Sequence, residues 1–296
     1  MAIQKTAPTI FQGIYAAALT PMHASLTVAA KELASHCLDL LDRGCSGIVL
    51  FGTTGEGASL SLQERIDTFK QVIDLGVPSQ NIILANGSSN LSDTVELAKA
   101  ALPYNIAALL IAPPSFFNVT EEGVTAFYRE IIQRIDHPHL PILLYHIPQF
   151  SGVPITLKII ETLRSEFPDT VIGIKESEGN LPFTKAILEK FPGFEVFVGN
   201  EKQMPESVYH GGSGAICGIA NLYPEELCHL YAQGKLTPLA SSKQIDAICT
   251  ALKECHFIPA FKAVLERKRG DIWHAVRPPL LPLSLKQKEK FLSQIH

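Results

Sequence analysis

One lysine of the sequence stands where an amine could act as a nucleophile. Lys175 directly follows the apolar run Val171–Ile174 and precedes Glu176. Burial at the end of a strand disfavours an ammonium ion, so we expect the pKa of Lys175 to lie below its usual value of about 10.4. A neutral amine can attack a carbonyl carbon and form a Schiff base. From position alone, the alternative is a lysine that reaches solvent or pairs with Glu176.

A tyrosine near the end of the preceding apolar run is the second candidate. Tyr145 lies in Ile142–Pro148, and in a barrel built in chain order it would neighbour Lys175. A phenol in that place can transfer protons. The alternative is a packed tyrosine whose hydroxyl is hydrogen-bonded. His146 should point to the opposite side of the pleat, so we expect it to be structural.

A third candidate is the segment Phe51–Glu56, of sequence Phe-Gly-Thr-Thr-Gly-Glu, which follows another apolar run. Gly52 and Gly55 permit tight backbone geometry. The hydroxyl and amide groups of Thr53 and Thr54 offer several donors to one small anion, and a carboxylate would fit. The segment is neither a P-loop, since no Gly-Lys-Ser/Thr follows, nor a dinucleotide-binding fingerprint. The alternative is a glycine-rich turn whose threonines cap backbone groups.

These candidates belong to a series of short apolar runs, each followed by a longer segment with helical spacing. The eight runs are Gly13–Leu19, Gly47–Gly52, Ile82–Gly87, Ala107–Pro113, Ile142–Pro148, Val171–Ser177, Phe194–Asn200 and Gly214–Asn221. Most are nearly continuously apolar, as parallel strands covered on both faces are. Eight such alternations fit a closed (β/α)8 barrel, an α/β fold, better than an open doubly wound sheet. Active sites of such barrels lie at the carboxyl ends of the strands, where Lys175, Tyr145 and Thr53 stand.

Helical spacing is clearest in Ser61–Leu75, which opens with the capping box formed by Ser61 and Glu64. Further helices are predicted to open at Thr120 and Thr156 and to cover 181–191, 224–234, 240–256, 257–269 and 284–295. Strand signals stop after Asn221. We therefore predict a catalytic barrel over residues 1–235 and a C-terminal helical extension over residues 236–296.

Composition and charge exclude several classes of protein. A chain of 296 residues with 46% hydrophobic and 18% charged residues can bury a large core and is not disordered as a whole. The net charge of −4 argues against a nucleic acid partner. No apolar run approaches the roughly 18 residues of a membrane span, and the N-terminal residues lack signal-peptide architecture. We therefore expect a cytoplasmic protein without a membrane partner.

The cysteines and the remaining histidine and arginine clusters give no sign of a metal or redox site. The six cysteines form no C-x-x-C pair and no finger-like spacing with histidine, so we expect reduced, structural thiols. His137 and His139 precede a strand, on the barrel face opposite the active site, and we predict no metal there. The run Arg267–Arg269 is short, so we expect a solvated helix end.

Four motifs together resemble, in order and spacing, the dihydrodipicolinate synthase / N-acetylneuraminate lyase family. They are Gly52–Glu56, Tyr145–Pro148 with Ser151 and Gly152 after it, Gly173–Ser177 and Gly212–Asn221. The resemblance covers nearly the whole chain. It implies a (β/α)8 barrel with a C-terminal helical extension, usually a homotetramer, that performs class I aldolase chemistry on pyruvate or another 2-oxo acid. It implies no metal and no organic cofactor, because the lysine imine itself is the electron sink.

The resemblance also implies a role for each matching residue. Lys175 matches the Schiff-base lysine, and Tyr145 matches the acid/base tyrosine. Thr53 and Thr54 match the pair that holds the substrate carboxylate and relays protons near the tyrosine. Ile216 matches a residue whose backbone lies beside the bound 2-oxo acid.

Departures from the family pattern bear on the substrate. In dihydrodipicolinate synthases, an arginine at the position of Phe150 binds the carboxylate of the second substrate, and a tyrosine at the position of Phe116 crosses the tetramer interface. Their loss argues against lysine biosynthesis. Sialic acid lyases fit in part, since Ser177 could replace their post-lysine threonine. However, their acidic pair appears here as Glu201–Lys202 and a polyol-binding serine as Gly218.

We therefore expect a Schiff-base-forming lyase or aldolase that uses pyruvate as the enamine component. The substrate would be a 2-keto-3-deoxy sugar acid or a 4-hydroxy-2-oxo acid. Recognition of the electrophile would fall to Ser177, Glu201 and the loop Ser115–Asn118. The alternatives are a dihydrodipicolinate synthase acting on pyruvate and aspartate semialdehyde, an N-acetylneuraminate lyase, a dehydratase of the same family, and a non-catalytic barrel that binds a 2-oxo acid.

Overall fold

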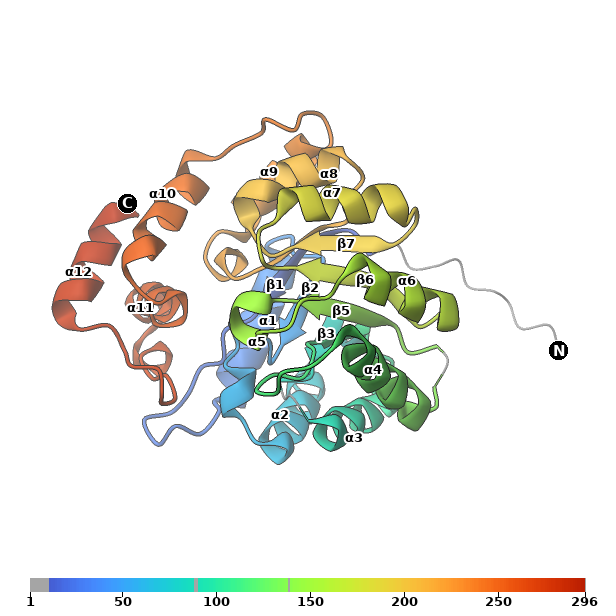
Figure 1. Cartoon of the computed structure of the whole chain (residues 1–296). Helices are drawn as coiled ribbons and strands as arrows, with labels where there is room; N and C mark the ends of the chain where they lie inside the picture. The colour runs from blue at the N-terminus through green and yellow to red at the C-terminus, as the bar shows by residue number, and fades with distance from the viewer. Residues whose placement is uncertain (1–10, 88–89, 138, 296) are drawn as a thin grey trace.

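The computed structural model describes residues 11–87, 90–137 and 139–295. Eight parallel strands close into a barrel in chain order, with β1 paired to β8 (Figure 1). The strands are β1 (Gly13–Ala17), β2 (Gly47–Leu50), β3 (Ile82–Ala85), β4 (Ala108–Ile111), β5 (Ile142–His146), β6 (Val171–Glu176), β7 (Glu195–Val198) and β8 (Gly214–Cys217). All eight predicted runs contain a strand, so the predicted (β/α)8 barrel is confirmed.

Helices follow the strands and continue beyond the barrel. They are α1 (Ala30–Asp42), α2 (Leu62–Asp74), α3 (Leu91–Ala101), α4 (Glu121–Ile135), α5 (Pro148–Ser151), α6 (Leu157–Glu166), α7 (Leu181–Lys190), α8 (Met204–Tyr209), α9 (Pro224–Gly234), α10 (Lys243–Ala251), α11 (Phe257–Arg269) and α12 (Leu285–Gln294). The predicted capping box is present, because Ser61 accepts from the Glu64 backbone N–H and the Glu64 carboxylate accepts from the Ser61 N–H.

One predicted helix is shorter than expected. The pattern over 240–256 gives only α10, because the Ser242 side chain caps the helix by accepting from the Ile245 N–H. Its last turn tightens into a 3₁₀ turn at Leu252–Glu254. Side-chain capping at the start and a change of hydrogen-bond pattern at the end therefore fix boundaries that apolar spacing alone overestimates.

The strands separate two apolar cores. Alternate side chains point into the barrel, where they form a compact cluster. That interior cluster consists of Phe11, Tyr15, Ala17, Val49, Ile83, Ala85, Ala108, Leu110, Leu143, Tyr145, Ile147, Phe197 and Ile216. The larger core lies between the strands and the surrounding helices and continues into the C-terminal helices. Apolar side chains thus fill the barrel interior below the carboxyl ends of the strands. We therefore expect the active site at that end of the barrel.

The C-terminal helices α10 to α12 gather on one side of the barrel (Figure 1, orange to red). They are attached to it by polar contacts of Arg269, whose guanidinium donates to the Nδ1 of buried His36 at 3.1 Å and pairs with Asp39 at 2.5 Å. Because a guanidinium only donates, the His36 Nδ1 accepts and its Nε2 donates to the Asn221 Oδ1 at 2.9 Å. Trp273 packs edge-on against the same imidazole. The extension is therefore docked against α1 and the segment after β8.

All six cysteines are free, as predicted. None of the helices in the described part of the chain combines the length and the apolar character of a bilayer span. The His137 and His139 rings lie near each other in the loop before β5, with centroids 6.4 Å apart.

Candidate active site

Lys175 and Tyr145 lie side by side near the carboxyl ends of β6 and β5, as the strand order predicts. They are register partners, and both side chains are buried. The Lys175 Nζ donates to the Tyr145 hydroxyl at 3.2 Å and lies 4.4 Å from the centre of the phenol ring. Since Tyr145 belongs to the cluster inside the barrel, the amine also faces the barrel axis. This places a nucleophile and an acid/base group within reach of one carbonyl.

Thr53 completes a chain of hydrogen bonds with this pair. Its Oγ1 lies 3.2 Å from the Tyr145 hydroxyl oxygen. The Tyr145 oxygen accepts from the Lys175 Nζ, and the hydrogen bond between Tyr145 and Thr53 can be donated by either hydroxyl. The arrangement is a relay that runs from the amine through the phenol to the threonine hydroxyl.

The turn after β2 that carries the two threonines is tightly folded. Phe51 and Glu56 both have left-handed backbone conformations, with φ of 58° and 55°. A Cβ on Gly57 would lie 1.8 Å from the Phe51 carbonyl oxygen, so only glycine fits there. Among the described residues, no backbone hydrogen bond uses the N–H of Thr53 or Thr54. The two amides are thus left to bind an anion, beside the Thr54 hydroxyl and the Thr53 hydroxyl that contacts Tyr145.

Thr54 lies close to Gly218, and Ile216 is two residues before that glycine, in β8. Thr54 is buried, and a Cβ built on Gly218 would come within 3.4 Å of its Oγ1. The same Cβ would lie 2.7 Å from the ring of Phe261, so Gly218 has no room for a side chain. Ile216 is fully buried inside the barrel, paired with Tyr15 of β1.

Glu201 is buried, and Ser177 is half-buried. The Ser177 Oγ is shielded from solvent and has no hydrogen-bond partner in the part of the chain that the structure describes. It packs closely on Gly199, where an added Cβ would lie 2.2 Å from this oxygen. The Glu201 carboxylate accepts from the Ile219 N–H at 3.2 Å. Burial raises the pKa of Glu201, although hydrogen bonds from the protein and the nearby charge of Lys175 act in the opposite direction. Contact of these two side chains with substrate stays a prediction.

Three phenylalanines are exposed in the segments that follow β4 and β5. Phe116 is 97% exposed, Phe117 is 71% exposed and Phe150 is 59% exposed. The Phe116 and Phe117 rings meet edge to face, and the Phe116 backbone is left-handed, with a φ of 79°. These rings offer no hydrogen-bond donor to a second carboxylate or a polyol.

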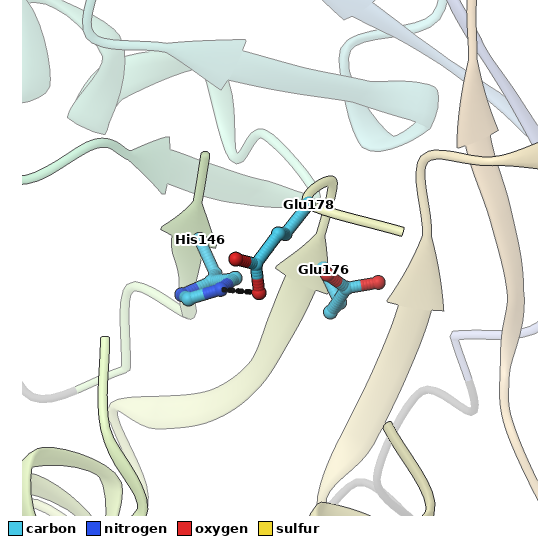
Figure 2. Close-up of side chains that lie close together, drawn as sticks. All are labelled: His146, Glu176 and Glu178. Atoms are coloured by element: carbon cyan, nitrogen blue, oxygen red, sulfur yellow. Dashed lines mark hydrogen bonds and ion pairs between the residues drawn. The ribbon is translucent and has the colours of Figure 1, made fainter. Parts of the chain in front are cut away.

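A cluster of His146, Glu176 and Glu178 has the side-chain types of a metal site, and its candidate ligand atoms lie within 4.8 Å of one another. Figure 2 shows the His146 imidazole facing the Glu178 carboxylate, with Glu176 beside them. However, the His146 Nδ1 accepts from the Ile155 N–H at 3.0 Å, so the neutral ring carries its proton on Nε2. That Nε2 lies 3.3 Å from Glu178 and donates to it. The imidazole therefore has no free lone pair for a metal ion.

The Glu176 carboxylate in this cluster also has a structural task. It accepts from the backbone N–H groups of Gly179 and Asn180 at 3.0 and 3.3 Å, just before α7. His146 and Glu176 are next to Tyr145 and Lys175 in sequence and point to the other side of the sheet. These outward contacts fix the strand ends from which the two inward side chains project.

Two further residues near the site were not assigned a role from the sequence. Glu56 ends the Gly-Thr-Thr-Gly-Glu segment, and Lys262 of α11 pairs with it at 2.5 Å in the protein interior. The signal for Lys262 is its position as the one lysine in the otherwise apolar stretch Phe257–Leu265. A charged side chain surrounded by apolar residues on both sides indicates a buried partner.

The comparisons with known proteins agree with this geometry. A family model described as the dihydrodipicolinate synthetase family matches residues 10–296. An uncharacterized DapA-like lyase of Chloroflexus aurantiacus is 31% identical over 278 residues, which are 92% of each chain. The crystal structure of dihydrodipicolinate synthase from Agrobacterium tumefaciens is 30% identical, with a TM-score of 0.89 over 95% of this chain and 97% of that one.

A more distant structure, the prophage protein YagE of E. coli K12 in complex with pyruvate, is 22% identical and covers 97% of this chain and 99% of its own, with a TM-score of 0.85. At that identity the likeness shows the fold alone. The family model and the two nearer relatives confirm the family resemblance and the expectation of an enzyme of this kind. The chain belongs to the dihydrodipicolinate synthetase family.

Proposed function

We propose that this protein is a Schiff-base-forming lyase that cleaves or forms a 2-oxo acid, with pyruvate as the enamine component. The substrate is a 2-keto-3-deoxy sugar acid or a 4-hydroxy-2-oxo acid. The observation that carries the proposal is the buried chain from Lys175 through Tyr145 to Thr53, with 3.2 Å at each step. The pyruvate complex of the structurally similar YagE protein supports a 2-oxo acid as ligand.

The reaction begins when the neutral amine of Lys175 attacks C2 of the 2-oxo acid. Tyr145 protonates the departing oxygen, water leaves, and a protonated imine remains between Nζ and C2. Thr53 and Thr54 hold the substrate carboxylate with their hydroxyl and amide groups. The orientation by these donors keeps C2 within reach of the amine.

Carbon–carbon cleavage then uses the imine as the electron sink. Tyr145 accepts the proton of the C4 hydroxyl, the C3–C4 bond breaks, and its electron pair moves into the imine to give an enamine. The aldehyde departs, C3 is protonated, and water hydrolyses the imine to release pyruvate. Each step balances without a metal ion or an organic cofactor, so we propose that none takes part.

Borohydride trapping tests this function directly. Reduction of a mixture of protein and pyruvate should add a reduced pyruvyl group to Lys175, located by peptide mass spectrometry. The Lys175→Ala variant and a sample without borohydride are the controls. An unmodified Lys175 at saturating pyruvate contradicts the proposal. A panel of 2-oxo acids, assayed by coupled detection of released pyruvate, then identifies the substrate.

Dihydrodipicolinate synthase is the second candidate, and the similarity to the Agrobacterium tumefaciens enzyme favours it. Against it, Phe150 and Phe116 supply neither a guanidinium nor a hydroxyl for the second substrate. Condensation of pyruvate with aspartate semialdehyde by the unmodified protein would establish this candidate.

The other two enzyme alternatives make different predictions. A sialic acid lyase is disfavoured because a serine side chain in place of Gly218 would meet the ring of Phe261. A dehydratase would use the same imine but eliminate water, so that a candidate substrate is consumed without release of pyruvate. A non-catalytic barrel would bind pyruvate and turn over none of the substrates.

We also propose that the chain assembles into a homotetramer, as the family resemblance implies. Exposed Phe116 and Phe117 support this, because a pair of large apolar side chains is costly to leave in water. Analytical ultracentrifugation measures the assembly state, and a monomer at micromolar concentration contradicts the proposal. The cytoplasmic location stays a prediction.

A further inference from the structure

The C-terminal extension places a buried cation against the turn that carries Thr53 and Thr54. Lys262 of α11 is 1% exposed, and the side chain of Glu56 in the turn is fully buried. Their Nζ and Oε1 atoms lie 2.5 Å apart, and the same Nζ donates to the Ala275 carbonyl at 2.7 Å. The other carboxylate oxygen of Glu56 accepts from the Arg277 backbone N–H at 2.8 Å. Both oxygens of Glu56 are thus bound by the extension.

Glu56 is coupled to the threonines through the backbone. Its N–H donates to the Thr53 carbonyl at 3.1 Å, so a movement of Glu56 moves Thr53. Glu56 and Phe51 occupy the left-handed region, which is unfavourable for residues with a Cβ. A turn with two such residues persists only when its surroundings hold it in place.

Two other side chains of the extension support the same turn. The Arg277 guanidinium donates to the carbonyls of Leu26 and Ser59 and pairs with Glu64 of α2. Phe261, next to Lys262, packs beside Gly218, where the Thr54 hydroxyl also lies. The contacts of the Glu56 carboxylate therefore come from residues more than 200 positions away.

The charge of Glu56 gives the pair a second consequence. An unpaired carboxylate two residues from Thr54 would repel the carboxylate of a 2-oxo acid, and in the protein interior that repulsion is only weakly screened. Lys262 neutralises this charge, so the amide and hydroxyl donors of the turn determine the local electrostatic field. Because the pair is neutral overall, it does not repel the substrate carboxylate, and the donors of the turn can bind that anion.

We propose that Lys262 is a positioning residue for the carboxylate of the 2-oxo acid. By pairing with Glu56 it holds the Thr53–Thr54 turn in its binding geometry, so the C-terminal extension is a working part of the site. The inference rests on the proposed Schiff-base chemistry at Lys175.

The test compares two ketones in the borohydride reaction. Pyruvate carries a carboxylate and acetone does not, yet both form an imine with Lys175. In the Lys262→Met variant we expect the ratio of pyruvate trapping to acetone trapping at Lys175 to fall at least roughly tenfold, as loss of hydrogen bonds to a charged group does. The half-saturating pyruvate concentration should rise by a similar factor. General loosening of the barrel would lower both trapping rates and leave their ratio unchanged.

Lys288→Met is the matched control. Lys288 lies in α12 and pairs with Glu266 at 2.8 Å, so its loss removes an ion pair from the extension without touching the turn. Its pyruvate-to-acetone ratio should equal that of the unmodified protein. A ratio in Lys262→Met that matches this control overturns the inference.

A double variant keeps the test valid if Lys262→Met does not fold. Lys262→Met combined with Glu56→Gln leaves no buried charge unpaired, and its ratio should still lie several-fold below that of the unmodified protein because the turn has lost its anchor. An unchanged ratio in the folded double variant overturns the inference. If the unmodified protein traps neither ketone at Lys175, the proposed function itself fails, and the two failures are thereby distinguished.

Discussion

Tyr145 and Lys175 face each other across β5 and β6 because the register of these two strands shifts by one residue. Ile142 pairs with Val171, whereas Leu143 pairs with Gly173, so Ile172 is left without a partner. With regular pairing, Tyr145 would lie opposite Ile174. The shift brings the amine and the phenol to 3.2 Å. A bulge that re-aims a side chain at the end of a strand is a recurrent device next to active sites.

Gly173 makes this arrangement possible. A Cβ on Gly173 would lie 2.4 Å from the Glu195 carbonyl oxygen and 2.8 Å from the Leu143 side chain. The strand can therefore shift and still pair with β7 on its other side, where Lys175 is opposite Phe197. Gly173, two residues before Lys175, is thus part of what positions the lysine.

Replacement of Tyr145 by Phe should slow turnover far more than it weakens imine formation. The phenol transfers protons in the cleavage step, and loss of such a group costs roughly 10²- to 10⁴-fold in rate. Coupled pyruvate detection measures the turnover, and borohydride trapping at saturating pyruvate measures the imine. Tyr104→Phe, a tyrosine that packs on Phe69 away from the relay, is the control. Turnover within twofold of the unmodified protein would exclude Tyr145 from the proton transfer.

Thr53→Val should interrupt the relay while it preserves the shape of the side chain. The Tyr145 hydroxyl then loses its hydrogen-bond partner at 3.2 Å, so we expect a loss of roughly tenfold or more in turnover. Thr53→Ser keeps the hydroxyl and should recover most of the activity. Equal losses in Thr53→Val and Thr53→Ser would show that the methyl group, and not the hydroxyl, is what matters.

The folded protein should lose stability in acid through His36. Burial lowers the pKa of His36 to about 4, below its unfolded value of 6.5. Because His36 binds a proton more weakly in the folded protein than in the unfolded chain, acid favours unfolding. The loss of stability begins near pH 6.5 and is complete below pH 4. By pH 4 it amounts to roughly 3 kcal/mol. Urea unfolding across this pH range measures the effect.

The His36→Gln variant tests the assignment of this pH dependence. Glutamine can still donate to Asn221 and accept from Arg269, but it does not titrate, so the free energy of unfolding should fall less steeply between pH 6.5 and 4. His139→Gln, at an exposed position, should leave the slope as it is. An identical slope in His36→Gln and the unmodified protein would assign the acid loss to other groups.

Phe150→Arg combined with Phe116→Tyr should raise the rate of condensation of pyruvate with aspartate semialdehyde. The guanidinium offers a bidentate partner to the second carboxylate, and the gain should be at least roughly tenfold. Phe117→Arg adds the same charge at another exposed position of the mouth and serves as the control. If the unmodified protein already condenses these substrates as fast as the double variant, the two phenylalanines do not exclude that substrate.

Local features of the sequence were enough to predict the architecture and the candidate residues. Apolar runs and helical spacing repeat within a few residues, and the capping box of Ser61 and Glu64 is closed within one turn, so each can be recognised without knowledge of the rest of the chain. Once eight strands in chain order form a barrel, their ends must converge, and the residues at those ends become neighbours. This is why Lys175, Tyr145 and Thr53 could be grouped from the sequence.

Contacts between distant segments were decided only in the tertiary structure. Lys262 and Glu56 are 206 positions apart, and nothing in the local pattern of either residue names the other as its partner. The shifted register of β5 and β6 likewise depends on how both strands fit their outer neighbours as the barrel closes. Local periodicity reports which side chains a segment buries, but the partner that each buried side chain meets depends on the packing of the whole chain.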